Sequence, residues 1–163
     1  ALRDEIPALL GSAQSETVAE SVLTLAELLA EDRPDLGIDA GDGDAGDRDA
    51  SGNGNRRVKL HGHCHQKAFD AVKPIETVLR DPAGVEVETI ETSCCGMAGA
   101  FGYGRDTYDV SMKMAETALL PAVRDADPDQ AILADGTSCR CQIGDGTDRE
   151  AAHLALYLDR LAP

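Results

Sequence analysis

Residues 85–99 read VEVETIETSCCGMAG, and this stretch decides the fold because it joins a strand to two adjacent cysteines and a glycine-rich loop. Val85 to Ile90 alternates apolar and polar side chains, which is the period of a half-buried strand. Glycines follow at positions 96, 99, 102 and 104, and clustered glycines indicate a loop. The stretch therefore predicts a strand that ends just before Cys94 and Cys95.

Two other predicted strands also end just before cysteines. A short β run at Val58–His61 precedes Cys64. An apolar run at Ala131–Ala134 precedes Cys139 and Cys141. Strands that are separated by helices form a parallel sheet with right-handed crossovers. We therefore expect an α/β fold, a small parallel sheet with flanking helices, and cysteines that converge at the C-terminal ends of the strands, where such folds bind ligands.

Two helices are expected in the first half of the chain. Apolar residues recur at helical spacing from Ser15 to Glu31, which predicts one amphipathic helix. Pro74 suits the first position of a helix, so a second helix should run from Pro74 to Arg80. Its inward-facing residues should be Ile75, Val78 and Leu79.

Two more helices are expected after the glycine-rich loop. Asp106 should cap a helix that ends before Pro128. One face of that helix should carry Val110, Met114 and Ala118. The last helix should begin at a capping box from Thr147 to Glu150. Its apolar stripe should consist of Leu154, Leu158 and Leu161.

The chain divides into three parts by composition. Residues 39–55 read DAGDGDAGDRDASGNGN and have no apolar side chain larger than Ala. Such a stretch buries too little surface to offset its ordering entropy. Calcium binding is a weaker interpretation, since the EF-hand glycine and closing glutamate are not at their offsets. We expect an N-terminal helical segment at 1–38, a disordered linker at 39–56 and a cysteine-rich domain at 57–163.

The charge of the chain excludes some classes of partner. The 163 residues carry a formal net charge of −15, with 19 Asp against 11 Glu and 11 Arg against 4 Lys. An acidic surface repels phosphate backbones, so no nucleic acid is expected. No apolar run is long enough to span a membrane. The Asp and Arg excess resembles proteins of extreme halophiles, with cation or basic-partner binding at moderate salt as the alternative.

The five cysteines indicate a metal site more than a disulfide framework, because nothing in the sequence marks the chain as secreted. Clustered thiolates select zinc, Cu(I) or iron–sulfur. The paired knuckles of a structural zinc site are absent from the sequence. Adjacent Cys94 and Cys95 would instead reach different irons of one cluster, and the glycines that follow would let backbone N–H groups approach its sulfurs.

Three short motifs resemble the cysteine-rich CCG domain over about residues 57–146. They are HCHQK at 63–67, CCGMAG at 94–99 and SCR at 138–140. That domain occurs in the B-subunit of heterodisulfide reductase, in the iron–sulfur subunits of anaerobic glycerol-3-phosphate dehydrogenase and glycolate oxidase, and at the C-terminus of FAD-linked oxidases. The resemblance is nearest to the last group, the flavin dehydrogenases of D-2-hydroxy acids.

The resemblance implies a set of metal ligands. The family pattern of Cys, CCG and CxxC implies that a [4Fe–4S] cluster binds through Cys64, Cys94, Cys95 and Cys139. The first Cys of the final CxxC falls on Gly136, so that ligand is absent. A site that requires five cysteines is therefore in doubt. Cys141 is a fifth ligand or a small buried residue, and the second interpretation is favoured.

The resemblance also implies a role and partners. The chain would be an iron–sulfur electron-transfer module whose flavin domain, with FAD, and ferredoxin-like region lie upstream. Residues 1–5, ALRDE, resemble the stretch after an upstream CCG copy, so the chain is expected to begin inside a longer polypeptide. Electrons would pass to a quinone or carrier. The expected location is the cytoplasm, including the inner face of the membrane through association with partners.

Two other functions remain open on the sequence: a structural zinc-binding interaction domain, and a heterodisulfide-reductase-like thiol redox module that uses Cys94 and Cys95. The histidines at 61, 63 and 65 alternate around Cys64. If the chain is extended there, His63 and His65 face away from Cys64 and could complete a zinc site. A histidine at a strand end more often donates a hydrogen bond to a loop or to a ligand, and we favour that interpretation.

Overall fold

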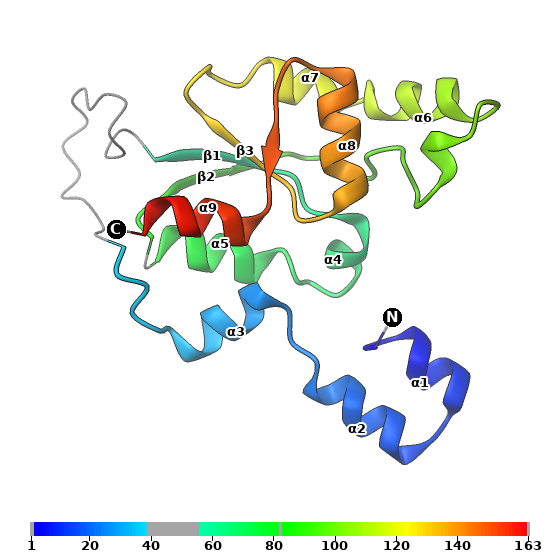
Figure 1. Cartoon of the computed structure of the whole chain (residues 1–163), viewed down its shortest axis with the longest axis vertical. Coiled ribbons are helices and arrows are strands. Elements are labelled where there is room, and N and C mark those ends of the chain that lie inside the picture. Colours follow the sequence, from blue (N-terminus) through cyan, green and yellow to red (C-terminus); the bar gives the residue numbers. More distant parts are fainter. Residues whose placement is uncertain (1, 39–55, 82, 163) are drawn as a thin grey trace.

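The structure confirms the predicted α/β class, and the strands of its sheet run parallel, as predicted. A computed structural model describes residues 2–38, 56–81 and 83–162. Its four strands are all parallel, in the order β2-β1-β3-β4, with helices on both faces (Figure 1). They are β1 (Arg57–Leu60), β2 (Glu86–Thr89), β3 (Ala131–Leu133) and β4 (Ala151–Ala152). The predicted linker lies, apart from Arg56, outside the described residues.

The chain adds its second strand on one side of β1 and its third and fourth strands on the other side. From β1 it passes through α4 (Cys64–Ala68) and α5 (Lys73–Arg80) to β2 on one side. It then returns through α6 (Tyr108–Ala115) and α7 (Leu119–Arg124) to β3 on the other side, and continues through α8 (Thr137–Gly146) to β4. Folds of this kind bind their ligands at the carboxyl ends of the two strands that flank such a reversal of strand order.

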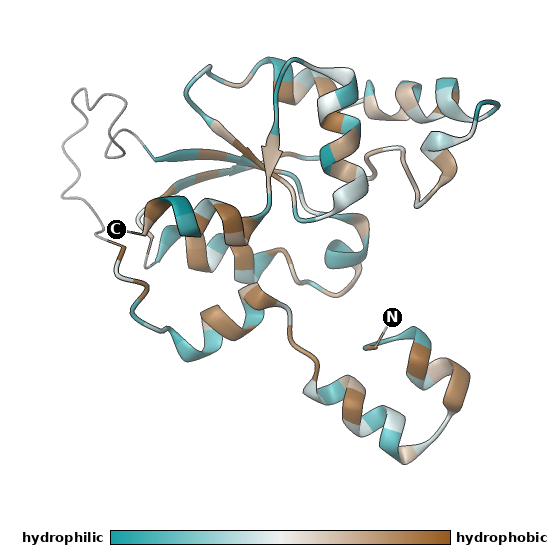
Figure 2. Ribbon diagram, viewed as in Figure 1, coloured by the Kyte–Doolittle hydropathy of each residue, from teal (hydrophilic) through white to brown (hydrophobic). Residues whose placement is uncertain are grey.

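One face of the sheet packs against α3 (Leu25–Asp32), α5 and α9 (Leu154–Leu161). Apolar residues lie along all three helices (Figure 2). As predicted, α5 buries Ile75, Val78 and Leu79. We call the buried residues of this face the α5 cluster: Ala26, Val58, Leu60, Ile75, Val78, Leu79, Ala83, Val85, Leu133, Leu154, Tyr157 and Leu158.

The opposite face packs against α6, α7 and α8, which lie across the sheet from α5 and α9 (Figure 1). Its buried residues include two of the cysteines. We call this set the α8 cluster: Ile90, Cys95, Met97, Ala115, Leu119, Leu120, Val123, Ala126, Ile132, Ala134, Cys139 and Ile143. The two clusters thus share one sheet and differ in chemistry.

The single helix predicted from Ser15 to Glu31 is wrong. The N-terminal segment contains α1 (Glu5–Leu10), α2 (Ala13–Ser21) and then α3. The break falls before Thr24, whose side chain accepts from the Glu27 N–H while Glu27 accepts from the Thr24 N–H. This reciprocal capping box starts a new helix at Leu25, because it satisfies backbone donors that a continuous helix would have used.

The helix predicted after Asp106 is also wrong in its bounds and its face. Thr107, and not Asp106, is the residue before α6, and α7 is a separate helix. Pro121 lies in the first turn of α7, where it has no N–H to bond back to residue 117. Val110 and Met114 are exposed, whereas Ser111 and Ala115 are buried against the rest of the fold.

The capping box predicted at Thr147–Glu150 does not form. Thr147 ends α8, and its hydroxyl donates to the Ile143 carbonyl at 2.7 Å. The short strand β4 follows, and α9 begins after His153, whose Nδ1 accepts from the Ala155 N–H at 3.1 Å. The predicted stripe is confirmed: Leu154 and Leu158 are buried and Leu161 packs beside them. No helix in the described ranges is both long and apolar enough to cross a bilayer.

Candidate metal centre

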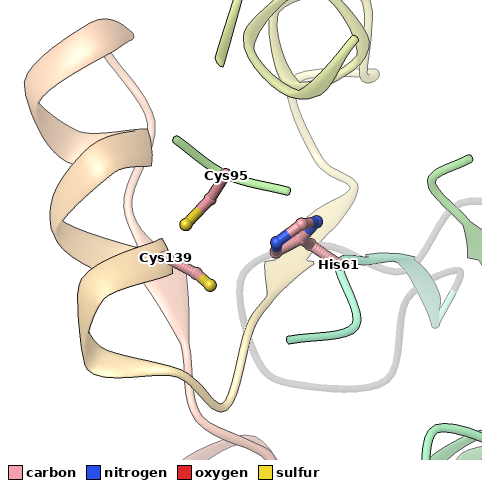
Figure 3. Close-up of side chains that lie close together, drawn as sticks. All are labelled: His61, Cys95 and Cys139. Carbon is pink, nitrogen blue, oxygen red and sulfur yellow. The ribbon is translucent and has the colours of Figure 1, made fainter. Parts of the chain in front are cut away.

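Three segments that follow sheet strands bring three soft donors together. His61 directly follows β1, Cys95 lies in the loop after β2, and Cys139 lies in the first turn of α8 after β3. Their donor atoms lie within 4.8 Å of one another (Figure 3). All three residues are buried, with 1%, 5% and 1% of their surface exposed. The carboxyl edge of the sheet therefore holds a compact site made of one imidazole and two thiols.

The two thiols of the site have opposite pKa shifts. Hydrogen bonding with Cys139 lowers the pKa of Cys95, with further lowering from His61 and from the Met97 N–H, against the opposing effect of burial. Hydrogen bonding with Cys95 raises the pKa of Cys139, and burial raises it further. These directions favour ionisation of Cys95 before Cys139. A metal ion that binds both sulfurs would release the proton held by Cys139.

The other two predicted ligands lie at the border of the site. Cys64 is exposed at the first position of α4, and Cys94 is partly exposed. The Cys94 Sγ accepts from the Gly96 N–H at 3.3 Å. Both thiols lie close enough to raise the pKa of Cys139 through their charge. The structure thus places Cys95 and Cys139 inside the site and Cys64 and Cys94 near it.

Cys141 lies apart from these sulfurs. It is on α8, partly exposed, and packs against the α8 cluster. A hydrogen bond with Cys141 raises the pKa of Tyr103. Cys141 was expected to be a small buried residue, but it is only partly buried where it packs against the α8 cluster.

His61 is the residue of this site that sequence reasoning underestimated. We expected His63 and His65 to face away from Cys64 on an extended chain, but the chain turns into α4 at Cys64. His63 instead caps α4 by accepting from the His65 N–H at 3.3 Å, and His65 pairs with Asp4 at 2.8 Å. The useful signal was the alternation in residues 58–61, which puts His61 on the face opposite Leu60.

Two glycines shape the walls of the site. Gly96 has φ +92°, and a Cβ there would collide with the Ser111 carbonyl oxygen. Only glycine therefore lets the backbone turn directly after Cys95. At Gly136, a Cβ would lie 2.6 Å from His63 Cδ2 and 3.0 Å from Cys139 Sγ. Position 136 thus faces the site, and the His63 ring, whose pKa burial lowers, fills the space beside it.

The donor set fits a soft metal or an iron–sulfur group. Thiolates and imidazole are the ligands that select zinc, iron and copper. His61 Nε2 is buried and makes no hydrogen bond of standard geometry among the described residues, and the His61 ring lowers the pKa of Cys95. A buried nitrogen without a partner costs free energy unless something binds it. The site therefore has both the ligands and an unmet bonding capacity.

Comparisons with known proteins give distant relatives among dehydrogenases. The chain is 25% identical over 107 residues to the C-subunit of anaerobic glycerol-3-phosphate dehydrogenase of Escherichia coli. The aligned region covers 65% of this chain and 26% of that protein. It is 30% identical over 97 residues to D-2-hydroxyglutarate dehydrogenase of Pseudomonas putida, covering 58% of this chain and 9% of that protein. The chain thus matches about a quarter of the first relative's length. No family model and no solved structure matches significantly.

Proposed function

We propose that this chain is an iron–sulfur electron-transfer module of a flavin-dependent 2-hydroxy-acid dehydrogenase of the lactate or glycolate type. The observation that carries the proposal is the buried group of Cys95, Cys139 and His61 in a chain distantly similar to two dehydrogenases. The proposed ligands are Cys64, Cys94, Cys95 and Cys139. Four thiolates are enough for a [4Fe–4S] cluster, which supplies one-electron transfer when bound.

The chain's own residues would hold and shield the group. Cys95 and Cys139 bind from the buried side, and Cys64 and Cys94 bind from the solvent side. Gly96 lets the backbone turn directly after the two adjacent cysteines. Burial on one side and exposure on the other suit a group that exchanges electrons with a partner through the exposed side.

The partners follow from the same proposal. FAD would lie on an upstream flavin domain, joined through a ferredoxin-like region, and electrons would leave toward a quinone or carrier. The cysteine-rich domain proposed at 57–163 would work in the cytoplasm or at the inner face of the membrane, held there by partners. Its acidic surface would keep it soluble at high salt.

The test is anaerobic purification with iron, sulfide and zinc analysis and an absorption spectrum. We expect a brown protein with iron and sulfide, and loss of both in Cys95→Ser and in Cys139→Ser. Cys141→Ser is the matched control, since it lies on the same helix two residues from Cys139, and it should keep the cluster. A folded protein that takes up no iron and sulfide on reconstitution would refute the proposal.

A second candidate is a structural zinc domain, favoured by the 4.8 Å grouping of one imidazole and two thiols. At a tetrahedral angle, metal–donor bonds of about 2.0–2.3 Å put two donors of one ion about 3.3–3.8 Å apart, so these side chains would shift closer together to bind a single zinc ion. This candidate predicts a colourless protein with one zinc per chain that unfolds on chelation. The thiol redox alternative predicts thiol-dependent turnover that either Cys94→Ser or Cys95→Ser abolishes.

A further inference from the structure

We propose that His61 is a direct ligand of the metal centre, and that it binds iron through Nε2 alongside the thiolates of Cys95 and Cys139. This inference rests on the proposed function and deepens it, because the four sequence-predicted ligands are all cysteines. It puts a nitrogen donor from the residue after β1 in the place of one of the two less buried thiols, Cys64 or Cys94, because each of the four irons of the cluster takes one protein ligand.

The first argument is the burial of the Nε2 nitrogen of His61. His61 is 1% exposed, and its Nε2 makes no hydrogen bond of standard geometry among the described residues, although the ring lies close enough to Cys95 to lower the pKa of that thiol. Leaving such an atom unsatisfied destabilises the folded chain unless a ligand binds it. His61 is also fixed in place, because its backbone N–H donates to the Leu133 carbonyl at 2.8 Å. The ring is therefore held at the site by the sheet itself.

The second argument is the environment of the other ring nitrogen, which admits the tautomer that a metal ligand needs. His61 Nδ1 lies 3.2 Å from Thr92 Oγ1. The Lys67 ammonium donates to the same oxygen at 3.2 Å and also to the Thr92 carbonyl. A hydroxyl oxygen has two lone pairs, so it can accept from both Lys67 and the Nδ1–H of His61. With the proton on Nδ1, the Nε2 lone pair is free for a metal, which is the usual arrangement of metal-binding histidines.

The third argument is the short distance between the three donor atoms. The His61 nitrogen and the sulfurs of Cys95 and Cys139 lie within 4.8 Å of one another. Iron–sulfur centres with histidine in place of cysteine are known, and the neutral imidazole raises their reduction potential relative to all-cysteine centres. His63 is a weaker candidate, because its Nδ1 already accepts from the His65 N–H and its ring is only partly buried.

The experiment is pulsed EPR on the anaerobically purified, reduced protein grown with ¹⁵N-histidine. We expect hyperfine coupling to a histidine nitrogen in the wild type and its loss in His61→Cys. That variant should keep its iron, since a thiolate replaces the imidazole, and its reduction potential should fall. His63→Gln and the distant control His153→Gln should keep the coupling.

Two results would overturn the inference while the proposed function stands: a cluster without histidine coupling, or a coupling that vanishes in His63→Gln and persists in His61→Cys. If the wild type takes up no cluster, the proposed function fails, and Co²⁺ becomes the probe. Co²⁺ should then bind wild-type apoprotein at least about tenfold more tightly than His61→Ala. Loss of a residue that only hydrogen-bonds to a ligand already lowers metal affinity by about that factor, so loss of a ligand should lower it at least as much. Equal Co²⁺ affinity would refute the role of His61.

Discussion

Both faces of the sheet bury an apolar core, yet among the described residues the thiols and the imidazole of the site gather on one face. The end of β1 and the residue after it show the difference: Val58 and Leu60 join the α5 cluster, whereas Lys59 and His61 point to the other side. Lys59 is 8% exposed and pairs with Glu88 at 3.3 Å. The α5 face is therefore an apolar support, and the α8 face is a polar site built into a core.

The difference follows from topology. Helix α5 joins β1 to the neighbouring strand β2, and the α5 face consists of packing contacts between helices and the sheet. The α8 face lies beside the reversal between β1 and β3, where the ends of these two strands supply His61 and, through α8, Cys139. Substitutions on the α5 face should change stability alone, whereas substitutions on the α8 face should change stability and metal binding together.

The largest effect should come from the apolar face. Leu79 is fully buried in α5, so Leu79→Ala should lower the free energy of unfolding by about 2–5 kcal/mol, because it leaves a cavity. Urea unfolding measures this loss. The metal bound per folded molecule should not change. The control Leu156→Ala on α9 removes a side chain that is 55% exposed and should cost far less. Loss of metal from folded Leu79→Ala would contradict the separation of the two faces.

A smaller loss of stability with a loss of metal is expected for Gly96→Ala. The positive φ alone costs about 1–3 kcal/mol for a residue with a side chain, and the collision with the Ser111 carbonyl adds to it. The strain should move Cys95, so metal affinity should fall as well. The matched control is Gly144→Ala, where a Cβ meets nothing within 4 Å. That helical site should gain about 0.5–1 kcal/mol and keep its metal. Unchanged metal affinity in Gly96→Ala would count against the proposed role of the loop.

The sequence was enough to predict the parallel sheet, because strand periodicity and the crossover rule both act locally. It was also enough to place the cysteines at one edge. It did not predict β4, since Ala151–Ala152 is too short to show a period. Thr147 was misassigned because a threonine can cap either end of a helix through its hydroxyl, and here it bonds back to Ile143. The role of His61 depends on the turn into α4, which changes how the histidines alternate.

The next prediction concerns the buried hydrogen bonds between Gln142 and Ser111 on the α8 face. Gln142 is 1% exposed, and its Nε2 donates to the Ser111 carbonyl at 3.2 Å and to the Ser111 hydroxyl at 3.0 Å. Gln142→Leu leaves both oxygens without this donor, so it should cost about 1–3 kcal/mol in urea unfolding. It should also loosen the contact between α8 and the loop at Gly96, and so weaken metal binding slightly. The double variant with Ser111→Ala should recover part of the loss. Strictly additive losses would show that the two residues are not coupled.

The smallest effect lies on the N-terminal segment, which joins the α5 face through α3. The Arg3 guanidinium donates to Glu27 at 2.8 Å and 2.9 Å and to the Val22 carbonyl at 2.6 Å. Hydrogen bonding to Arg3 is the main cause that lowers the pKa of Glu27 from 4.5 to about 2, while burial opposes it. The folded-state pKa is depressed, so this stabilisation is complete above about pH 4.5 and disappears as the pH falls toward 2.

Arg3→Ala should therefore cost about 0.2–1 kcal/mol near neutral pH at low salt. The difference from wild type should shrink between pH 4.5 and 2, because protonated Glu27 no longer attracts the guanidinium. Urea unfolding at several pH values measures it, with metal content unchanged throughout. The control Arg33→Ala breaks an exposed pair with Asp81, with side chains 63% and 71% exposed, and should have almost no effect at any pH. A constant difference for Arg3→Ala from pH 7 to 2 would mean that Arg3 acts through its bond to the Val22 carbonyl and not through the charge of Glu27.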